Sequence, residues 1–368
     1  MKRRAFVGAL GLGAAATLAG CRSEQSECSE SSSEKVSNNK VIQWTMVTTW
    51  PKNFQGLGEG AEYLAKTINQ LSGGRMNVTV MGAGDLVPAL QVFDTVASGT
   101  AQMGHGASYY WKGKLPVAPI FSAVPFGLNA QEMNGWLYHG GGLELWQELY
   151  APLGLIPMPA GNSGVQMAGW FNKEINSLDD IQGLKMRIPG LGGEVFKRAG
   201  GTPELIPGAE LFAALERGRI DATEWVGPYN DLAFGLHKAA KYYYYPGWHE
   251  PGTTLEAIIN QQAFAKLPSD LQAIVKMACT VANYDTLSFF TRKNNEALTE
   301  LTDKHQVQLK KLPDDVLNRF EALSEEVVQE LAVTDEFARK VYESYSTYKK
   351  QVYSWHRVSE QAFYDLRR

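Results

Sequence analysis

The sequence predicts an α/β protein of two similar lobes joined by crossing strands, with a long helix towards its C-terminal end. Three observations lead to this prediction. Strand-like and helix-like segments alternate from residue 41 onward, which is typical of βαβ units around a mostly parallel sheet. The alternation contains an internal repeat. Residues 269–368 contain no Gly and a single Pro, which favours long helices.

The chain has the composition of a folded, mildly acidic protein. Of its 368 residues, 44% are hydrophobic and 20% are charged, and its formal net charge is −4. Proteins that bind nucleic acid neutralise phosphates with clustered Lys and Arg, and the sequence shows no such basic patch. We therefore expect no nucleic acid partner.

Residues 1–21 have the pattern of an export signal. Residues 2–4 are basic, and the apolar stretch that follows is too short to span a bilayer as a permanent helix. The paired arginines resemble a twin-arginine signal, and the closing Leu-Ala-Gly-Cys resembles a bacterial lipobox. These patterns predict a periplasmic protein that is lipidated at Cys21 and contacts the membrane only through that anchor. The alternative is an ordinary cleaved signal peptide with an accidental Cys.

A flexible tether is expected at residues 22–40. This segment contains seven serines and too few apolar side chains to bury a core. A disulfide between Cys28 in the tether and Cys279 in a helical pattern is conceivable outside the cytoplasm, but disorder around Cys28 disfavours it. No Cys and His spacing in the sequence indicates a zinc site.

The first lobe is expected to consist of residues 41–163 together with about 253–290, and the second lobe of residues 164–252. The first lobe opens with a strand, a helix that ends at a Gly pair, and a second strand, which the hydrophobic spacing predicts at residues 41–47, 57–71 and 76–81.

The internal repeat relates one segment of each lobe. Residues 86–89, Leu-Val-Pro-Ala, correspond to residues 205–208, Leu-Ile-Pro-Gly. Each copy continues into an apolar helix that ends at a Gly and leads into a short strand. Ligands of open α/β sheets bind beyond the carboxyl ends of strands, and interfaces between domains are favoured positions for pockets. We therefore expect the site in the cleft between the lobes.

Residues 291–368 are predicted to form helices that pack on the lobes. Just before them, Ser269 and Gln272 have the spacing of a capping box. Apolar side chains further on recur every three or four residues, as on a long amphipathic helix. This stripe either packs on the protein's own sheet or reaches onto a second protomer, and its aromatic content favours a homodimer. Its members are Phe337, Val341, Tyr345, Tyr348, Val352 and Trp355.

Enzyme signatures are sparse. The sequence has no P-loop, no zinc-protease helix motif, no nucleophile elbow and no dinucleotide-binding glycine pattern. Glu224 with His249 is the only acid–base pair that can be assembled near the predicted cleft. An enzyme that acts on an oxoacid is therefore a remote alternative to a binding protein.

Arg187 is the strongest candidate for contact with a ligand. It is predicted near the end of a strand, where its planar guanidinium could hold a carboxylate through two parallel hydrogen bonds. It could instead be a solvated charge that shares one face of the strand with Lys185. Glu224 and Trp225 follow the strand of the second repeat, and Glu224 taken alone would be a surface acid.

Two segments in this order resemble the signature of the solute receptors of TRAP transporters, the tripartite ATP-independent periplasmic family. They are Gly-Leu-Lys-Met-Arg at 183–187 and Glu-Leu-Phe-Ala-Ala-Leu-Glu-Arg-Gly-Arg-Ile-Asp-Ala at 210–222. The resemblance implies the two-lobed fold of periplasmic solute-binding proteins, and a receptor that serves the small and large membrane subunits of a permease. Residues 164–171 and 223–228 resemble the branch that binds 2-oxoacids or lactate together with a metal ion.

The resemblance also implies how the site is built. In that branch a Gln side chain, a Glu side chain and a Trp carbonyl coordinate the cation, and these correspond to Gln166, Glu224 and Trp225. The Arg that holds the substrate carboxylate corresponds to Arg187. Oxygen ligands of this kind suit Na⁺ or Ca²⁺. Weaker candidates for lining or hydrogen-bonding the ligand are Trp50, Tyr109, Tyr110, Asn162, His249 and Glu250.

The expected ligand is a small 2-oxo or 2-hydroxy monocarboxylate such as pyruvate, 2-oxobutyrate or lactate. Two of its oxygens could chelate the cation while Glu224 balances the charge. A receptor for another organic anion, such as a C4-dicarboxylate or a longer oxoacid, is the alternative; it would keep Arg187 but would need no metal.

Overall fold

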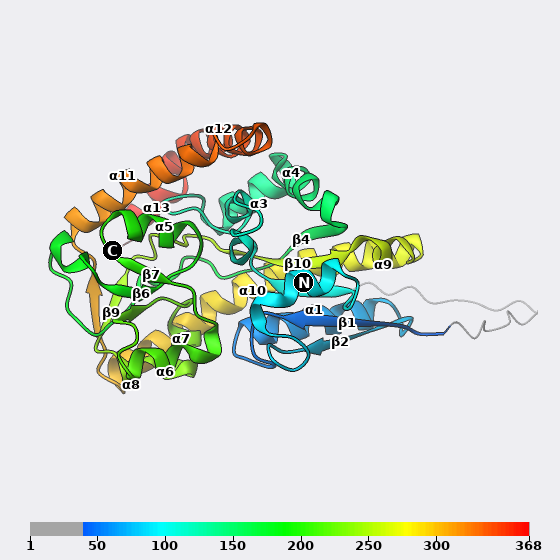
Figure 1. Ribbon diagram of the computed structural model, residues 1–368, viewed down its shortest axis with the longest axis horizontal. Helices are drawn as coiled ribbons and strands as arrows, with labels where there is room; N and C mark the ends of the chain where they lie inside the picture. The colour runs from blue at the N-terminus through cyan, green and yellow to red at the C-terminus, as the bar shows by residue number, and fades with distance from the viewer. Residues whose placement is uncertain (1–39, 368) are drawn as a thin grey trace, which may run out of the picture. The chain divides into compact units, whose positions relative to one another are not determined.

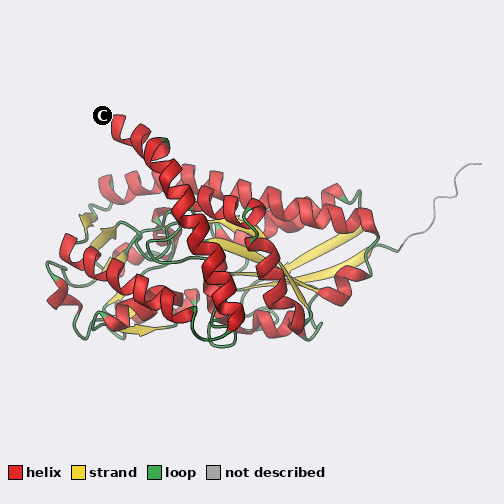
Figure 2. Ribbon diagram, turned by 90° about the horizontal axis from the view of Figure 1, so that it is seen from above, coloured by secondary structure: helices red, strands yellow, loops and turns green. Residues whose placement is uncertain are grey.

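The computed structural model describes residues 40–367, which form two mixed β-sheets with helices around them (Figure 1, Figure 2). This architecture confirms the predicted α/β fold class. The predicted export signal, the lipidation site Cys21, and Cys28 lie outside the described residues. Among the described helices, none combines the length and the apolar character needed to cross a membrane.

The first sheet consists of β1 (Ile42–Thr48), β2 (Met76–Met81), β3 (Met103–Gly106), β4 (Leu155–Asn162) and β10 (Thr254–Asn260). Its strand order is β2-β1-β3-β10-β4. β1 runs parallel to β2 and β3, whereas β10 lies antiparallel between β3 and β4. Every second residue of β2 is buried, which is the pattern of a strand with one covered face.

The second sheet consists of β5 (Gly169–Phe171), β6 (Lys185–Arg187), β7 (Thr202–Glu204), β8 (Ala222–Thr223), β9 (Tyr242–Tyr245) and β11 (Gln308–Lys311). Its strand order is β11-β9-β5-β8-β6-β7. β6 runs parallel to both of its neighbours, and β5 is antiparallel to both of its own. The parallel strands β6 and β8 end at the same edge of this sheet, and the candidate site described below lies at that edge.

The internal repeat of the sequence corresponds to a repeated structural unit. Each copy starts at a Pro with extended backbone, Pro88 at φ −58° and ψ 149° and Pro207 at φ −58° and ψ 146°. A single 3₁₀ turn follows and continues into a short helix, α2 (Val92–Ala97) or α6 (Leu211–Glu216). β3 follows the first copy and β8 the second, so the two units occupy equivalent places in the two sheets.

Helix α10 (Ser269–Asp303) packs along both halves of the protein, on β4 and α1 (Leu57–Leu71) and on α7 (Pro228–Phe234) (Figure 1). Its early residues, including buried Cys279, belong to the core over the first sheet, whereas Phe290 belongs to the core around Trp225. The predicted capping box does not form. Pro268 is the N-cap residue, and the Gln272 side chain donates back to the Leu267 carbonyl at 3.0 Å.

The C-terminal region differs from the predicted series of helices. Residue 291 falls inside α10, and residues 308–311 form β11, which pairs in parallel with β9 at the edge of the second sheet. The helices of this region are α11 (Asp314–Leu331), α12 (Glu336–Val358) and α13 (Glu360–Leu366).

The predicted amphipathic stripe lies on α12. Val341 and Tyr345 are buried against the same chain, and the Tyr345 hydroxyl accepts a hydrogen bond from the Leu128 amide at 3.0 Å. Towards the end of the helix the stripe emerges from the core, and Trp355 is 63% exposed. The first part of the stripe therefore packs on its own protein, while the last part faces outward.

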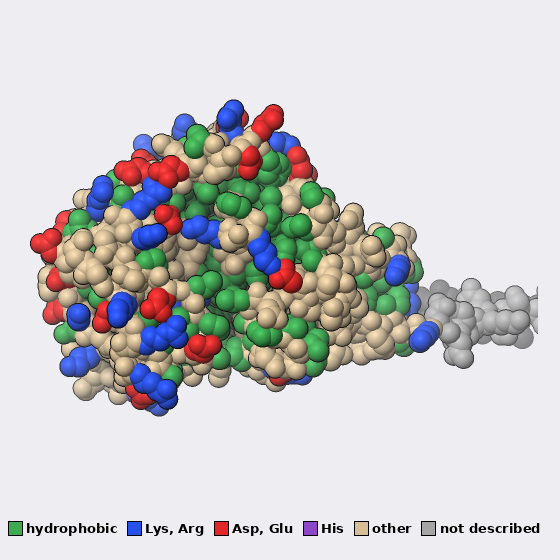
Figure 3. Space-filling model, in the orientation of Figure 1, with side chains coloured by type: hydrophobic (Ala, Val, Ile, Leu, Met, Phe, Trp, Pro, Cys, Tyr) green, Lys and Arg blue, Asp and Glu red, His purple; other side chains and the backbone are tan. Residues whose placement is uncertain are grey.

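The remaining α-helices of the described residues surround the sheets. On the face shown in Figure 3, Lys and Arg side chains intermingle with Asp and Glu. The bounds of these helices are α3 Ala130–His139, α4 Gly142–Tyr150, α5 Gly190–Arg198, α8 Leu236–Ala239 and α9 Gln261–Ala265.

Candidate functional site

Arg187, Glu224 and Trp225 come together at the carboxyl ends of two parallel strands. Arg187 is the last residue of β6 and pairs in register with Thr223, the last residue of β8. Glu224 and Trp225 follow directly, so the register of the sheet sets them beside Arg187. The side chains of Arg187 and Glu224 are 1% and 0% exposed. The alternatives of a solvated charge and a surface acid are therefore wrong.

The Arg187 guanidinium is fully engaged inside the protein. Its Nη1 forms an ion pair with Glu224 Oε1, its Nη2 donates to the Tyr110 hydroxyl at 3.3 Å, and its Nε donates to the Ile206 carbonyl at 3.3 Å. The guanidinium carbon lies 4.9 Å from the centre of the Trp225 ring. Burial acts to lower the pKa of Arg187, but the Glu224 carboxylate raises it and the net pKa lies above its usual value. Arg187 is therefore a permanent, preorganised positive charge.

A second buried carboxylate, Glu250, orients Gln166. Glu250 Oε2 accepts hydrogen bonds from Gln166 Nε2 at 2.8 Å and from the Thr253 hydroxyl at 2.6 Å. The Ser163 hydroxyl lies 3.1 Å from the same Gln166 nitrogen. Burial, followed by the negative charge of Glu224, raises the pKa of Glu250 to about 7. These hydrogen bonds use the Gln166 nitrogen, so the Gln166 oxygen, Oε1, is left to bind another group.

His249 brings a third titratable group to the two acids. Its Nε2 lies 3.4 Å from Glu224 Oε2. Glu224, His249 and Glu250 each offer one possible metal-ligand atom, and these atoms all lie within 4.8 Å of one another. The acid–base pair that the sequence suggested, Glu224 with His249, therefore does meet, as part of a cluster of charged groups.

Several polar atoms of this cluster are buried without a hydrogen-bond partner. Within residues 40–367, no hydrogen bond is made to Gln166 Oε1, Glu224 Oε2 or the main-chain oxygen of Trp225, although His249 Nε2 lies 3.4 Å from Glu224 Oε2. The main chain directly after Gln166 is adjacent to the main chain directly after Trp225, since the Met167 amide donates to the Val226 carbonyl at 3.1 Å. Buried polar atoms normally find a partner. Three such oxygens, two of them neutral and one anionic, fit a hard cation such as Na⁺ or Ca²⁺.

The weaker candidates occupy different positions. Tyr110 reaches Arg187 directly, and Tyr109 packs edge-on against Tyr110 with ring centres 4.7 Å apart. The Trp50 indole N–H donates to His105 Nδ1 at 2.9 Å. Asn162 uses its amide to hold neighbouring main-chain groups, with distances of 3.1 and 2.8 Å. The polar groups of Trp50 and Asn162 are thus paired within the protein, whereas the tyrosines lie around Arg187.

Sequence reasoning missed Ser163 and Thr253, which bind the Gln166 nitrogen, and it missed the buried Asp231. A signal for Thr253 was available. Residues 249–253 are mostly polar and directly precede β10, all of whose residues are buried. A polar cluster at the entrance of such a strand indicates a loop that carries function.

Comparison with known proteins agrees with this geometry. Residues 46–335 match the model of the DctP family, bacterial extracellular solute-binding protein family 7. The chain is 45% identical over 322 residues, 88% of each protein, to a monocarboxylate 2-oxoacid-binding periplasmic protein of Nostoc sp. PCC 7120.

Two solved structures of TRAP periplasmic solute-binding proteins are also similar. One, from Pseudoalteromonas atlantica with bound sodium and pyruvate, is 44% identical with a TM-score of 0.87, covering 89% of this chain and 100% of that one. The other, from Colwellia psychrerythraea with bound calcium and pyruvate, is 43% identical with a TM-score of 0.86, covering 89% and 99%. The chain therefore belongs to the DctP family of extracytoplasmic TRAP solute-binding proteins, a family of receptors and not of enzymes.

Proposed function

We propose that the protein is a receptor that binds a small 2-oxo or 2-hydroxy monocarboxylate through a bound Na⁺ or Ca²⁺ and delivers it to the membrane subunits of a TRAP permease. The observation that supports this most strongly is the buried Arg187–Glu224 pair, together with three oxygens, on Gln166, Glu224 and Trp225, that accept no hydrogen bond. Two solved structures that are more than 40% identical to this chain hold pyruvate, one with sodium and one with calcium. Pyruvate, 2-oxobutyrate and lactate are the ligands of this class.

Each residue of the site has a distinct task in this proposal. Arg187 exchanges its contact with Glu224 for two parallel hydrogen bonds to the ligand carboxylate, the geometry that a planar guanidinium favours. Gln166, Glu224 and the Trp225 carbonyl hold the cation, which supplies a positive charge for the oxygens of the ligand. Tyr110 fixes the far side of the guanidinium. Burial excludes water, so that each of these contacts is stronger than at the surface.

The two-lobed organisation is part of the proposal. We infer that residues 41–163 with about 253–290 form one lobe and residues 164–252 the other, and that they close over the ligand. The distribution of side chains supports this, because Tyr109 and Tyr110 come from the first set of residues and Arg187 from the second.

The test is a thermal-unfolding screen of the purified protein, freed of bound ligand. Pyruvate, 2-oxobutyrate, lactate, a longer 2-oxoacid and succinate are each added with Na⁺, with Ca²⁺ or with neither. A ligand at about 100 times its Kd adds about 2.7 kcal/mol to stability, which gives a clear shift. We expect stabilisation by the small 2-oxo or 2-hydroxy acids only when a cation is present. Stabilisation without a cation, or by succinate alone, would show a plain dicarboxylate receptor and refute the metal role.

We also propose that the protein is exported by its twin-arginine-like signal and anchored through lipid on Cys21. The support is the sequence pattern of residues 1–21. Cys21→Ser should abolish incorporation of labelled fatty acid and partition into detergent, whereas Cys28→Ser should change neither. Replacing both Arg3 and Arg4 by Lys should block processing. Normal lipidation of the Cys21 variant would contradict the proposal.

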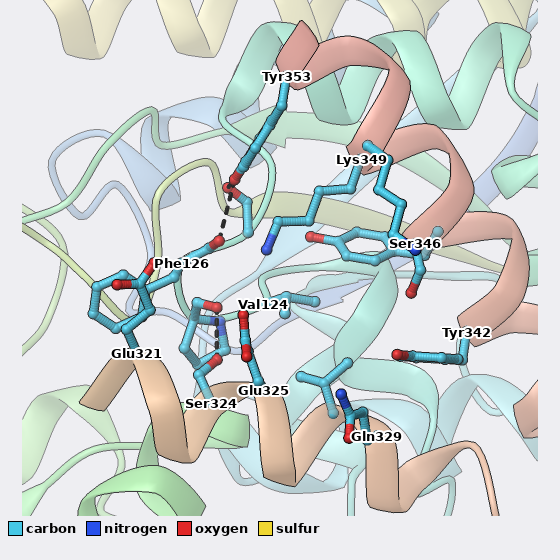
Figure 4. A pocket seen from close by; sticks show the side chains of 15 residues that line it. Val124, Phe126, Glu321, Ser324, Glu325, Gln329, Tyr342, Ser346, Lys349 and Tyr353 are labelled. Atoms are coloured by element: carbon cyan, nitrogen blue, oxygen red, sulfur yellow. Dashed lines mark hydrogen bonds between the residues drawn. The ribbon is translucent and has the colours of Figure 1, made fainter. Parts of the chain in front are cut away.

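We further propose that a second copy of the chain packs on the C-terminal helices. Trp355 and Val358 on α12, and Phe363 and Leu366 on α13, are large apolar side chains that are more than half exposed. A groove of about 600 Å³ lies between α11, the middle of α12 and residues 124–127 (Figure 4). Exposed apolar side chains gathered at one end of a protein favour an interface with another chain.

The dimer is tested by light scattering over a range of concentrations. Wild type should have twice the mass of one chain, and Trp355→Ser combined with Val358→Ser should shift it towards the monomer. Tyr284→Ser is the matched control, because Tyr284 is 74% exposed on α10, outside this region. A monomeric wild type at every concentration would refute the dimer.

A further inference from the structure

Asp231 is a buried acid just behind the proposed cation site. It lies on α7, the helix that follows Trp225, and is 1% exposed. Its Oδ2 accepts hydrogen bonds from the Trp170 indole at 3.0 Å and the Tyr243 hydroxyl at 2.7 Å, and its Oδ1 lies 3.4 Å from the Val226 amide. No Lys, Arg or His of residues 40–367 forms an ion pair with it. A buried carboxylate without a basic partner is costly and calls for a specific reason.

The contact with Val226 has a direct geometric consequence for Trp225. The Val226 N–H and the Trp225 C=O belong to the same peptide group, which is trans. In a trans peptide these two bonds point in opposite directions. When the N–H is directed at Asp231 in the core, the Trp225 oxygen is directed away from Asp231.

The next peptide group, between Val226 and Gly227, is also held in place. The Val226 carbonyl accepts a hydrogen bond from the Met167 amide at 3.1 Å, directly after Gln166 in the chain. The Trp225 oxygen itself receives no donor from the described residues. The peptide is thus held at Val226 while its own oxygen remains available.

We propose that Asp231 is a positioning residue for the cation site, which holds the peptide between Trp225 and Val226 so that the Trp225 oxygen faces the ion. A hydrogen-bond acceptor on the N–H side also polarises the peptide and makes its oxygen a stronger ligand for a hard cation. The inference rests on the proposed function, because it requires that the Trp225 carbonyl bind the cation. Metal sites are commonly supported by such outer partners of their ligands.

A purely structural role would have a different signature. Trp170 and Tyr243 stack with ring centres 4.0 Å apart, and Asp231 ties their polar ends together. If holding these two rings were the only task of Asp231, replacing Asp231 would lower the stability of the protein but would not specifically weaken cation binding. Tyr243→Phe separates the two roles, since it removes a hydrogen bond to Asp231 but leaves the contact with Val226 intact.

The experiment is a calorimetric titration of the ligand-free protein with Ca²⁺, and separately with Na⁺, alone and at a fixed concentration of pyruvate. We expect Asp231→Asn to weaken Ca²⁺ binding by about tenfold or more, the range found for outer partners of metal ligands. At saturating Ca²⁺ the variant should regain most of its pyruvate affinity. Tyr243→Phe should stay within about twofold of wild type for Ca²⁺, because it leaves the contact between Asp231 and the Val226 amide in place.

The outcomes distinguish this inference from the proposed function. A wild type that binds no Ca²⁺ or Na⁺ under either condition would refute the cation site itself. A wild type that binds Ca²⁺, with an Asp231→Asn variant that binds it equally well or no worse than Tyr243→Phe, would refute the role of Asp231 alone.

A second measurement on the wild type keeps the inference testable if the Asp231 variant does not fold. Hydrogen exchange of the Val226 amide should be slow before any cation is added, because Asp231 already holds it. Rapid exchange that slows only when Ca²⁺ is added would show that the cation, and not Asp231, orders this peptide. That result would overturn the inference.

Discussion

Replacing Arg187 by Lys tests the proposed ligand contact with little disturbance of the fold. Arg187 is 1% exposed and forms a buried ion pair with Glu224. Removing one partner of such a pair costs about 3–5 kcal/mol, so Arg187→Ala would confuse loss of binding with loss of folding. Lys keeps the positive charge beside Glu224 but presents a single ammonium group in place of a planar fork.

The expected loss follows from the hydrogen bonds that the substitution removes. A ligand carboxylate would keep one charge-assisted hydrogen bond and lose the second, which is worth about 1.5–3 kcal/mol. That free energy corresponds to about a 10- to 150-fold weaker Kd for pyruvate at saturating cation. Ca²⁺ binding alone should change far less, because Gln166, Glu224 and Trp225 remain in place.

Calorimetry of pyruvate binding at saturating Ca²⁺ measures the effect, and unfolding by urea reports separately on stability. Lys185→Ala is the matched control. Lys185 lies on the same strand two residues earlier and is exposed, so its loss should alter neither quantity. If Arg187→Lys retained its pyruvate affinity within about threefold, the two-bond contact would be refuted, since less than one charge-assisted hydrogen bond would have been lost.

Three further predictions concern the supporting groups. Glu224→Gln should abolish the effect of the cation on acid binding and lower the unfolding free energy by about 3–5 kcal/mol, measured by urea titration with and without Ca²⁺. Burial raises the pKa of Glu256 to about 8, so the stability this group contributes is full below its usual pKa and is lost as the pH rises towards 8. Glu256→Gln should therefore make the urea midpoint fall less between about pH 5 and about pH 8 than in wild type, and an equal fall in both would contradict this. Gly169 has a φ of +118°, and a Cβ there would collide with the Thr223 carbonyl. Gly169→Ala should cost about 1–3 kcal/mol, while Gly113→Ala, in open space, should leave the melting temperature unchanged.

Local patterns in the sequence were sufficient for the general architecture. Hydrophobic spacing located β1, α1 and β2. The repeated Leu-x-Pro segments indicated two similar units, and these have the same backbone conformation at Pro88 and Pro207. β11 was not predictable in this way. It is four residues long, lies at an edge and is largely exposed, so it shows no clear alternation. Its partner, β9, lies more than sixty residues earlier in the chain, and only the folded sheet brings them together.

The sequence was sufficient to propose which residues form the candidate site, but not how their side chains are arranged. Resemblance to a family indicated Gln166, Arg187 and Glu224, but no sequence pattern shows that Arg187 and Glu224 form an ion pair. That pairing depends on the register of β6 and β8. The role we assign to Asp231 was hidden for the same reason, since the direction of one peptide bond depends on contacts between segments that are distant in the sequence.

The pairing of Arg187 with Glu224 links the two ligands of the proposed receptor. An organic acid that takes Arg187 for itself leaves the buried Glu224 carboxylate without its partner, which is costly in a site closed to water. A cation at Glu224 likewise leaves Arg187 as an uncompensated positive charge. Only when the organic acid and the cation are both bound do Arg187 and Glu224 each keep a neighbour of opposite charge. The acid and the cation should therefore bind with positive cooperativity, each raising the affinity for the other by the same factor. A receptor built in this way has little tendency to close on either one alone.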